Sequence, residues 1–434
     1  MRHFFIFSYE LNHFLKTRTK VVSYLFFILA CIYSLFNGFQ LHDKQLNTIK
    51  NIKEQETESL AKVLNWFEND LSGPEDRSWV DITDPYWAIR YSPTYVIKEP
   101  SLLLPLGIGQ AEQYGYYQKL SIWSSPLDND IVEEISNYER LINGNIDFSF
   151  LILFLLPLLI IILTYNVRGL ESDLKFHDLV SVQVGDYKKW VFYRLLFYAV
   201  LLLFSVDCLF LSVAVINNVF SYQFFELIIL SNFYILIYFI SFYLIIIKSN
   251  GSISVAFKMI ALWLTFCVLV PGAVHQYINL KYPTNYMTDF LDANRKDTYD
   301  VFKLSKEELN EQLIEIYPEL LLSKHAKDSV INRTIVRNTM SAIVNQINVN
   351  AIEKINQQNF SKNNLITKAY FFNPLSFFQN KWNALTETDY HSYSDYRKYT
   401  QSKIDKRLEL LVYDCWNSKK LDLKSYNEYL NLLK

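Results

Sequence analysis

The stretch between Asp147 and Arg168 constrains this chain more than any other feature, because it contains twenty uncharged residues in a row. A helix needs about 20 mostly apolar residues to cross a bilayer, so the run predicts a transmembrane helix. Four more segments have the same character, and we place the transmembrane helices at residues 21–39, 147–167, 190–217, 227–247 and 252–274. The chain is therefore expected to be an all-α polytopic membrane protein with five transmembrane helices.

The first of these segments follows several basic residues, as the apolar core of a signal peptide does. No small-residue cleavage site comes after it, so we expect an anchor that stays in the protein. The whole chain has only 10 glycines and 11 prolines in 434 residues, which favours helices over turn-rich sheet. A net charge of −2 argues against nucleic-acid binding driven by basic charge.

Basic residues in the short loops indicate the orientation of the helices. Lysine and arginine gather before the first segment and in residues 168–189, whereas the loop at 217–225 has none. We expect residues 1–20 to form a cytoplasmic interfacial segment, residues 168–189 to be cytoplasmic, and residues 190–274 to hold the last three transmembrane helices. Residues 40–146 and 275–434 are then two extracytoplasmic, largely helical domains, and the C-terminus is extracytoplasmic.

Four residues inside the transmembrane segments stand out. Pro157 lies in the middle of the second and Pro271 near the end of the fifth, where a proline frees a carbonyl and kinks a helix. Asp207 in the third is costly in a bilayer unless paired. Its carboxylate is either functional, or lies near the outer end, or pairs with a neighbouring helix. Arg194 is nearer the cytoplasmic end and is expected to extend its charge to the interface.

Catalytic patterns are absent from the sequence. The seven histidines do not fall at metal-ligand spacing, the four cysteines give no disulfide framework, and no phosphate-binding G-x-x-x-x-G-K-[ST] motif occurs. We therefore expect a non-catalytic chain with no cofactor or metal of its own. In the distal sequence, Ser305 and Glu308 form a capping-box pattern that begins a helix.

The segment 168–189 is the largest predicted cytoplasmic loop, and its apolar residues form a short amphipathic helix. It carries four acids and four bases in balance. Two interpretations remain open, a docking surface for a cytoplasmic protein or a plain interfacial helix. The candidate docking residues are Glu171, Asp173, Lys175, Phe176, His177, Asp178 and Asp186.

Four stretches together resemble the permease subunits of type-2 ABC transporters, in the subgroup with large extracytoplasmic inserts that is related to multicopper-enzyme-maturation permeases. They are LLLPLGIGQAEQYGYYQKLS at 102–121, NGNIDFSFLILFLLPLLIIILTYNV at 143–167, the loop from Glu171 to Lys189, and VPGAVHQYINLKYPT at 270–284 with NPLSFFQNKWNALTETDY at 373–390. In that family the segment 168–189 corresponds to the coupling helix.

The resemblance implies a permease in a bacterial cytoplasmic membrane that pairs with a second permease, the same or a related chain. It also implies a cytoplasmic P-loop ATPase dimer that binds ATP and Mg²⁺. The sequence departs from the family in two ways: only Glu171 and Asp173 match the acids of its loop, and the usual sixth transmembrane helix is not found. We expect that helix to be absent or its role to be supplied by a partner.

Two substrate classes are open: the apolar and aromatic segments suit lipids, lipopeptides or hydrophobic peptides, whereas the family likeness points to copper-enzyme maturation. Besides membrane lipid, an extracytoplasmic partner protein is possible. A different hypothesis is a membrane-anchored sensor or assembly factor whose external domains bind a partner. A membrane-tethered enzyme is disfavoured, because no cluster of histidines, cysteines or paired carboxylates is found.

Overall fold

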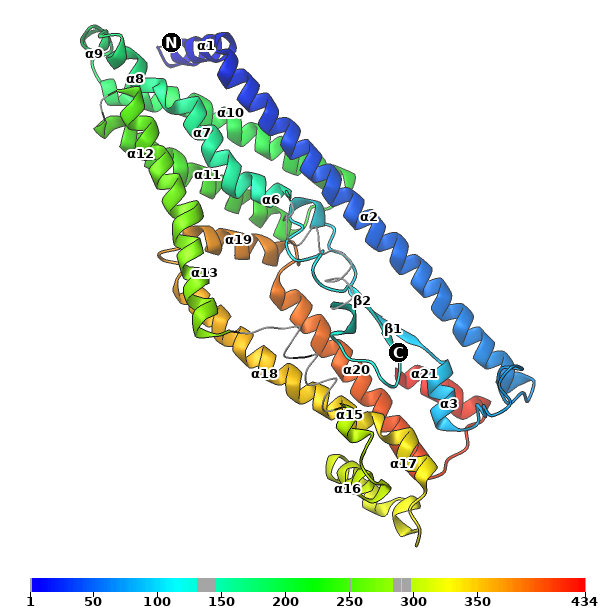
Figure 1. The fold of residues 1–434 in the computed structure, drawn as a ribbon. Coiled ribbons are helices and arrows are strands. Elements are labelled where there is room, and N and C mark those ends of the chain that lie inside the picture. Colours follow the sequence, from blue (N-terminus) through cyan, green and yellow to red (C-terminus); the bar gives the residue numbers. More distant parts are fainter. Residues whose placement is uncertain (1, 131–145, 250, 284–289, 291–297, 434) are drawn as a thin grey trace.

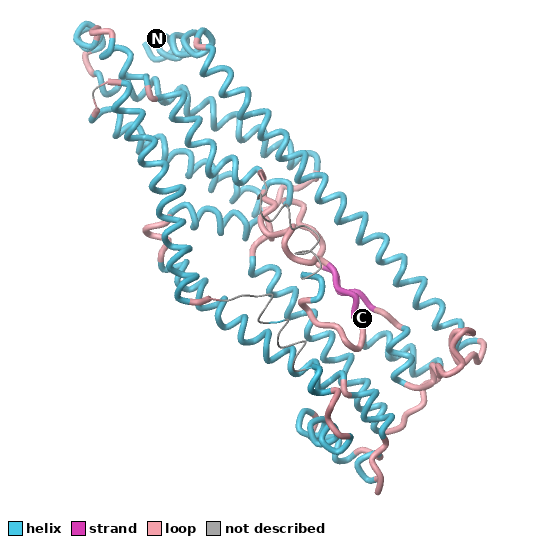
Figure 2. Tube along the Cα trace, viewed as in Figure 1, coloured by secondary structure: helices cyan, strands magenta, loops and turns pink. Residues whose placement is uncertain are grey.

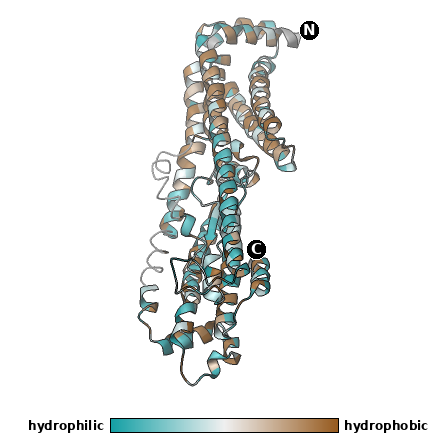
Figure 3. Ribbon diagram, turned by 90° about the vertical axis from the view of Figure 1, so that its right-hand side faces the viewer, coloured by the Kyte–Doolittle hydropathy of each residue, from teal (hydrophilic) through white to brown (hydrophobic). Residues whose placement is uncertain are grey.

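The computed structural model describes residues 2–130, 146–249, 251–283, 290 and 298–433. This part of the chain is elongated and almost wholly helical (Figure 1). Hydrophobic helices gather at the end that holds the N-terminus, and more hydrophilic ones form the opposite end (Figure 3). We call the first region the apolar bundle. The second region, built from residues 43–130 and 298–433, is the distal domain.

Five helical stretches in the described residues are long and apolar enough to cross a membrane, as the sequence predicted. They are α2 (Arg18–Glu68), the run Phe148–Gly169, α10 (Tyr187–Ile216), α11 (Tyr222–Lys248) and the run Ser252–Lys281. The α2 helix continues without a break for 51 residues, so its first part lies in the bundle and its second part in the distal domain. A membrane protein is the class that these helices support.

Each of the two proline-containing runs includes a short π-helical segment directly before its proline. The second run consists of α6 (Phe148–Phe150), η2 (Leu151–Leu155), α7 (Leu156–Thr164) and the start of α8 (Asn166–Asp173). The fifth consists of α12 (Ser252–Leu264), η3 (Thr265–Leu269) and α13 (Val270–Lys281). Pro157 and Pro271 follow η2 and η3 by two residues, so the regular hydrogen-bond ladder changes close to each proline.

Side chains from neighbouring helices replace the backbone donor that Pro157 lacks. The hydroxyl of Tyr234 donates to the carbonyl of Leu153 at 2.5 Å, and the indole N–H of Trp263 donates to that of Phe154 at 3.0 Å. A proline removes the N–H that would pair with the carbonyl four residues earlier, which is Leu153 here. The buried tyrosine thus satisfies a carbonyl that water cannot reach in an apolar layer.

Three short helices lie at the N-terminal end of the bundle. The first, α1 (Arg2–Lys16), meets α2 at Thr17 and packs beside α10. The other two, α8 and α9 (His177–Val184), connect the second and third long helices. All three lie close together at this end of the molecule (Figure 1).

The distal domain is formed by both large polar segments of the sequence together. Leu60 and Ile89 from the first segment share one hydrophobic core with Leu408 and Tyr426 from the second. The two segments therefore pack as a joint unit. The remaining helical elements of this domain are α3 (Pro85–Tyr91), η1 (Leu104–Leu106), α15 (Thr298–Val301), α16 (Lys306–Ile316), η5 (Pro318–Leu322), η6 (His325–Lys327), α17 (Arg333–Thr339), α18 (Ser341–Lys368), α19 (Pro374–Leu385), α20 (Tyr390–Trp416) and α21 (Leu423–Leu433).

Local signals in the distal domain agree only partly with the sequence analysis. The capping box at Ser305 and Glu308 is present and begins α16. A two-stranded antiparallel sheet, β1 (Thr94–Ile97) with β2 (Tyr117–Leu120), was not predicted. Its strands lie among the loops that separate α3 from the bundle (Figure 2).

One helix of the distal domain, α19, packs into the apolar bundle. Its residues Leu375, Phe378, Trp382 and Leu385 belong to the same hydrophobic core as the long helices. Lys381 forms an ion pair of 2.8 Å with Glu226 near the start of α11. The 12 residues of α19 are too few to cross a bilayer, so it enters the apolar region without spanning it.

A buried junction joins α19 to the segment before the bundle. Asp147 caps α6, and its other carboxylate oxygen accepts hydrogen bonds from the backbone N–H groups of Ile108 and Gly109 at 3.0 and 3.3 Å. The indole N–H of Trp382 donates to the carbonyl of Leu106 at 2.9 Å, and Thr388 donates to that of Gly107 at 3.1 Å. Segments 102–121 and 373–390 thus meet the described part of 143–167 at one place.

Candidate functional site

A cluster of buried charges joins three helices at the N-terminal end of the bundle. Its centre is Arg194 on α10, whose side chain is 2% exposed. Its guanidinium pairs with the carboxylate of Glu10 on α1, and with that of Glu171 on α8 at 2.7 Å. It also donates to the carbonyl of Val167 at 2.5 Å. The expectation that Arg194 extends to the interface is wrong, because two carboxylates satisfy its charge inside the bundle.

Further donors complete the coordination of the two carboxylates. The hydroxyl of Tyr198 donates to Glu10 at 2.9 Å and accepts from the ammonium group of Lys20 at the same distance. On the other side, the indole of Trp190 and the hydroxyl of Tyr187 donate to Glu171 at 3.2 and 3.1 Å. We call Glu10, Lys20, Glu171, Tyr187, Trp190, Arg194 and Tyr198 the Arg194 cluster.

The cluster has two positive and two negative formal charges, so it is neutral as a whole. Removing ions from water costs several kcal/mol per ion, and the cost is recovered only when every charge has well-placed partners. Glu10 is fully buried, and Arg194 is nearly so. The arrangement therefore favours one relative position of α1, α8 and α10 strongly over others, because a displaced helix would leave a buried charge without its partner.

The helix α8 is attached to the other long helices as well. Arg168 donates to the carbonyl of Ile246 at the C-terminal end of α11, at 3.0 Å. Asp173 accepts from the backbone N–H of Ser252, which begins α12, at 3.4 Å. Gly169 lies directly against Ser252, and a Cβ at this position would collide with the backbone of α12. Three helices, α10, α11 and α12, thus hold α8 directly.

In contrast, α9 and the turn before it present apolar side chains to the outside. Lys175 adopts a left-handed backbone conformation, with φ at 62°, and turns the chain between the two helices. The exposed large apolar residues are Leu174, Phe176, Leu179 and Val182, and Val182 is 84% exposed. These side chains could contact a membrane surface or a protein, so both interpretations of the segment 168–189 persist at this point.

The candidate docking residues predicted from sequence therefore divide between two places. Glu171 and Asp173 bind α8 to the bundle, whereas Lys175 and Phe176 are exposed beside α9. His177 and Asp178 begin α9, and their side chains lie outside the described part of the structure. Asp186 caps α10, and the backbone N–H of Lys189 contributes most to lowering the pKa of this exposed carboxyl.

Asp207 lies far from the Arg194 cluster along α10. It is half-buried and accepts a hydrogen bond from the amide of Asn232 on α11 at 3.2 Å. The alternative in which this carboxylate pairs with a neighbouring helix is the one observed. The contact supports packing of α10 against α11 and brings no other charged group to the site.

Sequence reasoning missed Glu10, which is the buried partner of Arg194. A signal was present, because Glu10 is the only acidic residue before Asp43 and lies shortly before the first transmembrane segment. A lone carboxylate beside a membrane helix with a lone arginine predicts a pair. The described residues contain no cluster of three or more histidine, cysteine or acidic side chains that could hold a metal ion.

Comparison with known proteins gives no further assignment. No family model matches the chain, and no curated protein or solved structure matches it. The arrangement of the site is thus the basis for any statement about function. Chemically, the Arg194 cluster is a neutral, fully engaged set of charges that fixes the position of α8 relative to the bundle.

Proposed function

We propose that the chain is the membrane-spanning permease subunit of an ATP-driven ABC transporter, powered by a separate cytoplasmic ATPase. The observation that carries the proposal is the contrast between α8 and α9. The first is fixed to α10 by an ion pair and to α11 and α12 by hydrogen bonds and close backbone contact, and it is linked to α1 through Arg194. The second extends from it with exposed apolar side chains.

This contrast is what a coupling element requires. A docking surface must be accessible to a partner, and the part behind it must be rigid enough to transmit a displacement to the membrane helices. An interfacial helix that only lies on the membrane needs no such attachment. The excess of lysine and arginine near α1, α8 and α9 supports a cytoplasmic location for this end and an extracytoplasmic location for the distal domain.

In this arrangement the permease works with a second copy or a related chain and with an ATPase dimer in a bacterial cytoplasmic membrane. The ATPase supplies ATP and Mg²⁺ chemistry, and this chain supplies the path for a hydrophobic or peptide-like substrate. ATP binding shifts the equilibrium between two arrangements of the bundle only if the ATPase binds one arrangement better. The Arg194 cluster is the element that makes α8 and the long helices move together.

Purification of the tagged chain from its native host in mild detergent tests the proposal. We expect a P-loop ATPase to co-purify in about equal amount. A Val182→Glu variant should lose it, because a charge placed in an apolar interface must be desolvated on binding. The matched control is Gln183→Glu, which adds the same charge at the next residue, and which should retain the ATPase if Val182 faces it.

Two outcomes would contradict the proposal. The first is a stable complex with extracytoplasmic proteins and no ATPase, which would instead support a sensor or assembly factor. The second is an ATPase that still co-purifies when α9 is replaced by a glycine-serine linker, since docking would then lie elsewhere.

A further inference from the structure

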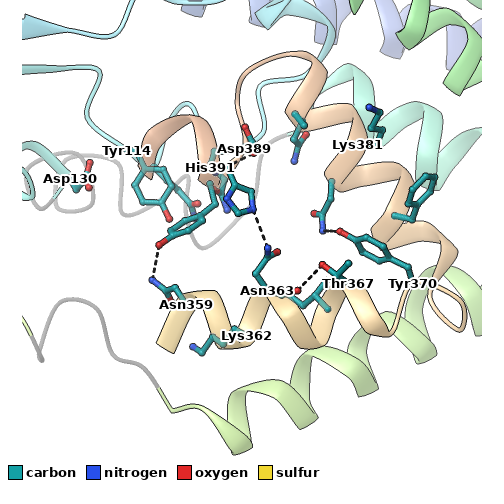
Figure 4. A pocket seen from close by; sticks show the side chains of 18 residues that line it. Tyr114, Asp130, Asn359, Lys362, Asn363, Thr367, Tyr370, Lys381, Asp389 and His391 are labelled. Carbon is teal, nitrogen blue, oxygen red and sulfur yellow. Dashed lines mark hydrogen bonds between the residues drawn. The ribbon is translucent and has the colours of Figure 1, made fainter. Parts of the chain in front are cut away.

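A cavity of about 680 Å³ lies in the distal domain beside the apolar bundle. Its walls are α18, α19, the first turn of α20 and the segment 110–114 (Figure 4). Cavities of this size are typical of sites for small molecules. The cavity belongs to neither the Arg194 cluster nor the α8–α9 pair, and it changes in character from one end to the other.

One end of the cavity is lined by amide, hydroxyl and imidazole groups. Asn359 donates to the hydroxyl of Tyr390 at 3.3 Å, and the amide of Asn363 lies 3.1 Å from a ring nitrogen of His391, so α18 is joined to α20 (Figure 4). Such groups recognise neutral polar ligands through paired hydrogen bonds. This end suits a ligand rich in hydroxyl or amide groups.

Two amide side chains of the lining have unsatisfied oxygens. The side-chain oxygens of Gln110 and Asn383 are buried and have no hydrogen-bond partner among the described residues. Buried polar atoms nearly always have a partner, so an unsatisfied pair at one cavity calls for an explanation. A ligand that donates hydrogen bonds, such as one with hydroxyl groups, would provide it.

Once ion pairs are set aside, the lining keeps one lysine, Lys362, and one carboxylate, that of Asp389, which backbone N–H groups stabilise. Lys381 is paired with Glu226, Asp130 pairs with Arg397 at 2.9 Å, and the carboxylate of Asp389 caps α20. Lys362 has no ion-pair or hydrogen-bond partner in the part of the chain that the structure describes, and partial burial lowers its pKa. An anionic group on a ligand would neutralise this ammonium.

The other end of the cavity combines aromatic rings with polar groups, since the amide of Asn380 donates to the hydroxyl of Tyr370 at 2.8 Å. It includes Tyr370 and Phe377, near the junction of α18 and α19. Two residues of α19 contact α11 at different heights. Lys381 pairs with Glu226, whereas the ring of Phe378 lies 4.8 Å from that of Tyr234, measured between centroids. Tyr234 is eight residues further along α11, which is about 12 Å at the rise of an α-helix.

This geometry places the loop between α18 and α19 at the depth of the apolar layer. Phe371 and Phe372 in that loop are 88% and 68% exposed. Exposed neighbouring phenylalanines are unfavourable in water and favourable in lipid. The end of the cavity lined by Tyr370 and Phe377 adjoins this exposed phenylalanine pair.

We propose that this cavity binds an amphiphile of the surrounding bilayer, whose head group carries hydroxyl groups and one anionic group. Lys362 pairs with the anion, Gln110 and Asn383 accept from hydroxyls, and the acyl chains leave past Tyr370 and Phe377. The lipid would be the substrate of the proposed permease, and this part of the inference rests on the proposed function. Binding of the lipid does not, because it needs no ATPase.

The test uses the full chain without ATPase, reconstituted in nanodiscs that contain equal amounts of phosphatidylglycerol and phosphatidylcholine. The protein is then released from the nanodiscs, and native mass spectrometry measures which lipid stays bound to it. Phosphatidylglycerol has hydroxyl groups and a net negative charge, so we expect it to be retained preferentially. Lys362→Gln and Asn383→Ala should each lower its retention about tenfold, as the loss of a charge-assisted or buried hydrogen bond does.

The matched control is Lys354→Gln, which removes the same charge from an exposed position on α18, outside the cavity. This variant should retain phosphatidylglycerol normally. Equal retention of the two lipids, or equal retention by all variants, would overturn the proposal. A second experiment adds soluble glycerol 3-phosphate as a competitor of the bound phosphatidylglycerol. If it displaces the lipid only weakly, the ligand is a lipid. If it binds as tightly as the lipid does, the site recognises a soluble phosphate and the proposal of a lipid ligand is overturned.

Failure of this inference and failure of the proposed function can be told apart. A chain that binds phosphatidylglycerol at Lys362 but never co-purifies with an ATPase retains the lipid site and loses the permease assignment. A chain that co-purifies with an ATPase through α9 but shows no lipid preference retains the permease assignment and loses this site.

Discussion

Removing the charge of Arg194 should destabilise the protein more than removing either of its acidic partners. Its side chain is 2% exposed, that of Glu10 is fully buried and that of Glu171 is 13% exposed. Replacing one partner of a buried ion pair costs about 3–5 kcal/mol, because a charge is left without compensation. Arg194→Met leaves two carboxylates in this state, so we expect a loss at the upper end of that range.

The acidic partners should follow in order of burial. In Glu10→Gln, Arg194 keeps Glu171 and the Val167 carbonyl as partners. We therefore expect the free energy of unfolding to fall by about 3 kcal/mol, which is roughly a hundredfold in the unfolding equilibrium. Glu171→Gln should cost less, since Glu171 is partly hydrated. The double variant Arg194→Met/Glu10→Gln should cost less than the sum of its parts by about 1–3 kcal/mol, as coupled neighbours do.

Unfolding of the purified chain by sodium dodecyl sulfate in mixed micelles, followed by tryptophan fluorescence, measures these differences. Trp190 hydrogen-bonds to Glu171 and reports on the cluster directly. Lys189→Met is the control, because this lysine is on the same helix with its side chain 75% exposed. If Arg194→Met and Glu10→Gln cost no more than the control, or if the double variant is additive, the assignment of a buried, coupled cluster is refuted.

Two further predictions concern the middle of the bundle and the distal domain. Tyr234→Phe removes the donor to the carbonyl that Pro157 leaves free, so it should lower the free energy of unfolding by about 1–3 kcal/mol in the same assay. In a Pro157→Ala background the loss should be less than half of that. An equal loss in both backgrounds would contradict this explanation. Burial alone would raise the pKa of Asp81, but hydrogen bonds from Lys420 and Thr83 outweigh it and lower the pKa below its ordinary value of 3.8. This contribution to stability is present above about pH 4 and is lost as the pH falls through the lowered pKa. Circular dichroism between pH 5 and 3 should therefore show a steeper loss of distal-domain stability in the parent chain than in Asp81→Asn. Parallel curves of stability against pH would disprove this role of the Asp81 carboxylate.

The transmembrane helices could be predicted from sequence because the bilayer sets a local rule of length and composition. The same rule explains why α19 was missed. Its 12 residues include Asn380 and Lys381, so no window of the sequence has the character of a membrane helix. Only the contacts of Trp382 and Phe378 with the bundle place it in the apolar core, and such contacts join residues that are far apart in the chain.

The partners of Arg194 show a similar limit. The cost of placing Arg194 within a membrane helix can be predicted from the sequence. Whether its side chain extends to the interface or pairs internally depends on Glu10, which is 184 residues away in the chain. The β1–β2 hairpin was missed for another reason. Its strands have four residues each and are joined by a long irregular connection, so neither an alternating pattern nor a tight-turn signal is present.

The second membrane run connects the two best-defined polar sites of the molecule. Asp147 at its start is bound at the distal junction, and Glu171 beyond its end is bound in the Arg194 cluster. The 24 residue steps from one to the other span about 36 Å if helical. Since both ends are fixed by buried hydrogen bonds, any displacement of α8 relative to the distal domain must be absorbed between them. The π-helical segment before Pro157 is the place where the backbone ladder is already interrupted and where Tyr234 and Trp263 replace its donors. Those two side-chain bonds can break without loss of a helical turn, so they are the contacts at which the run yields first.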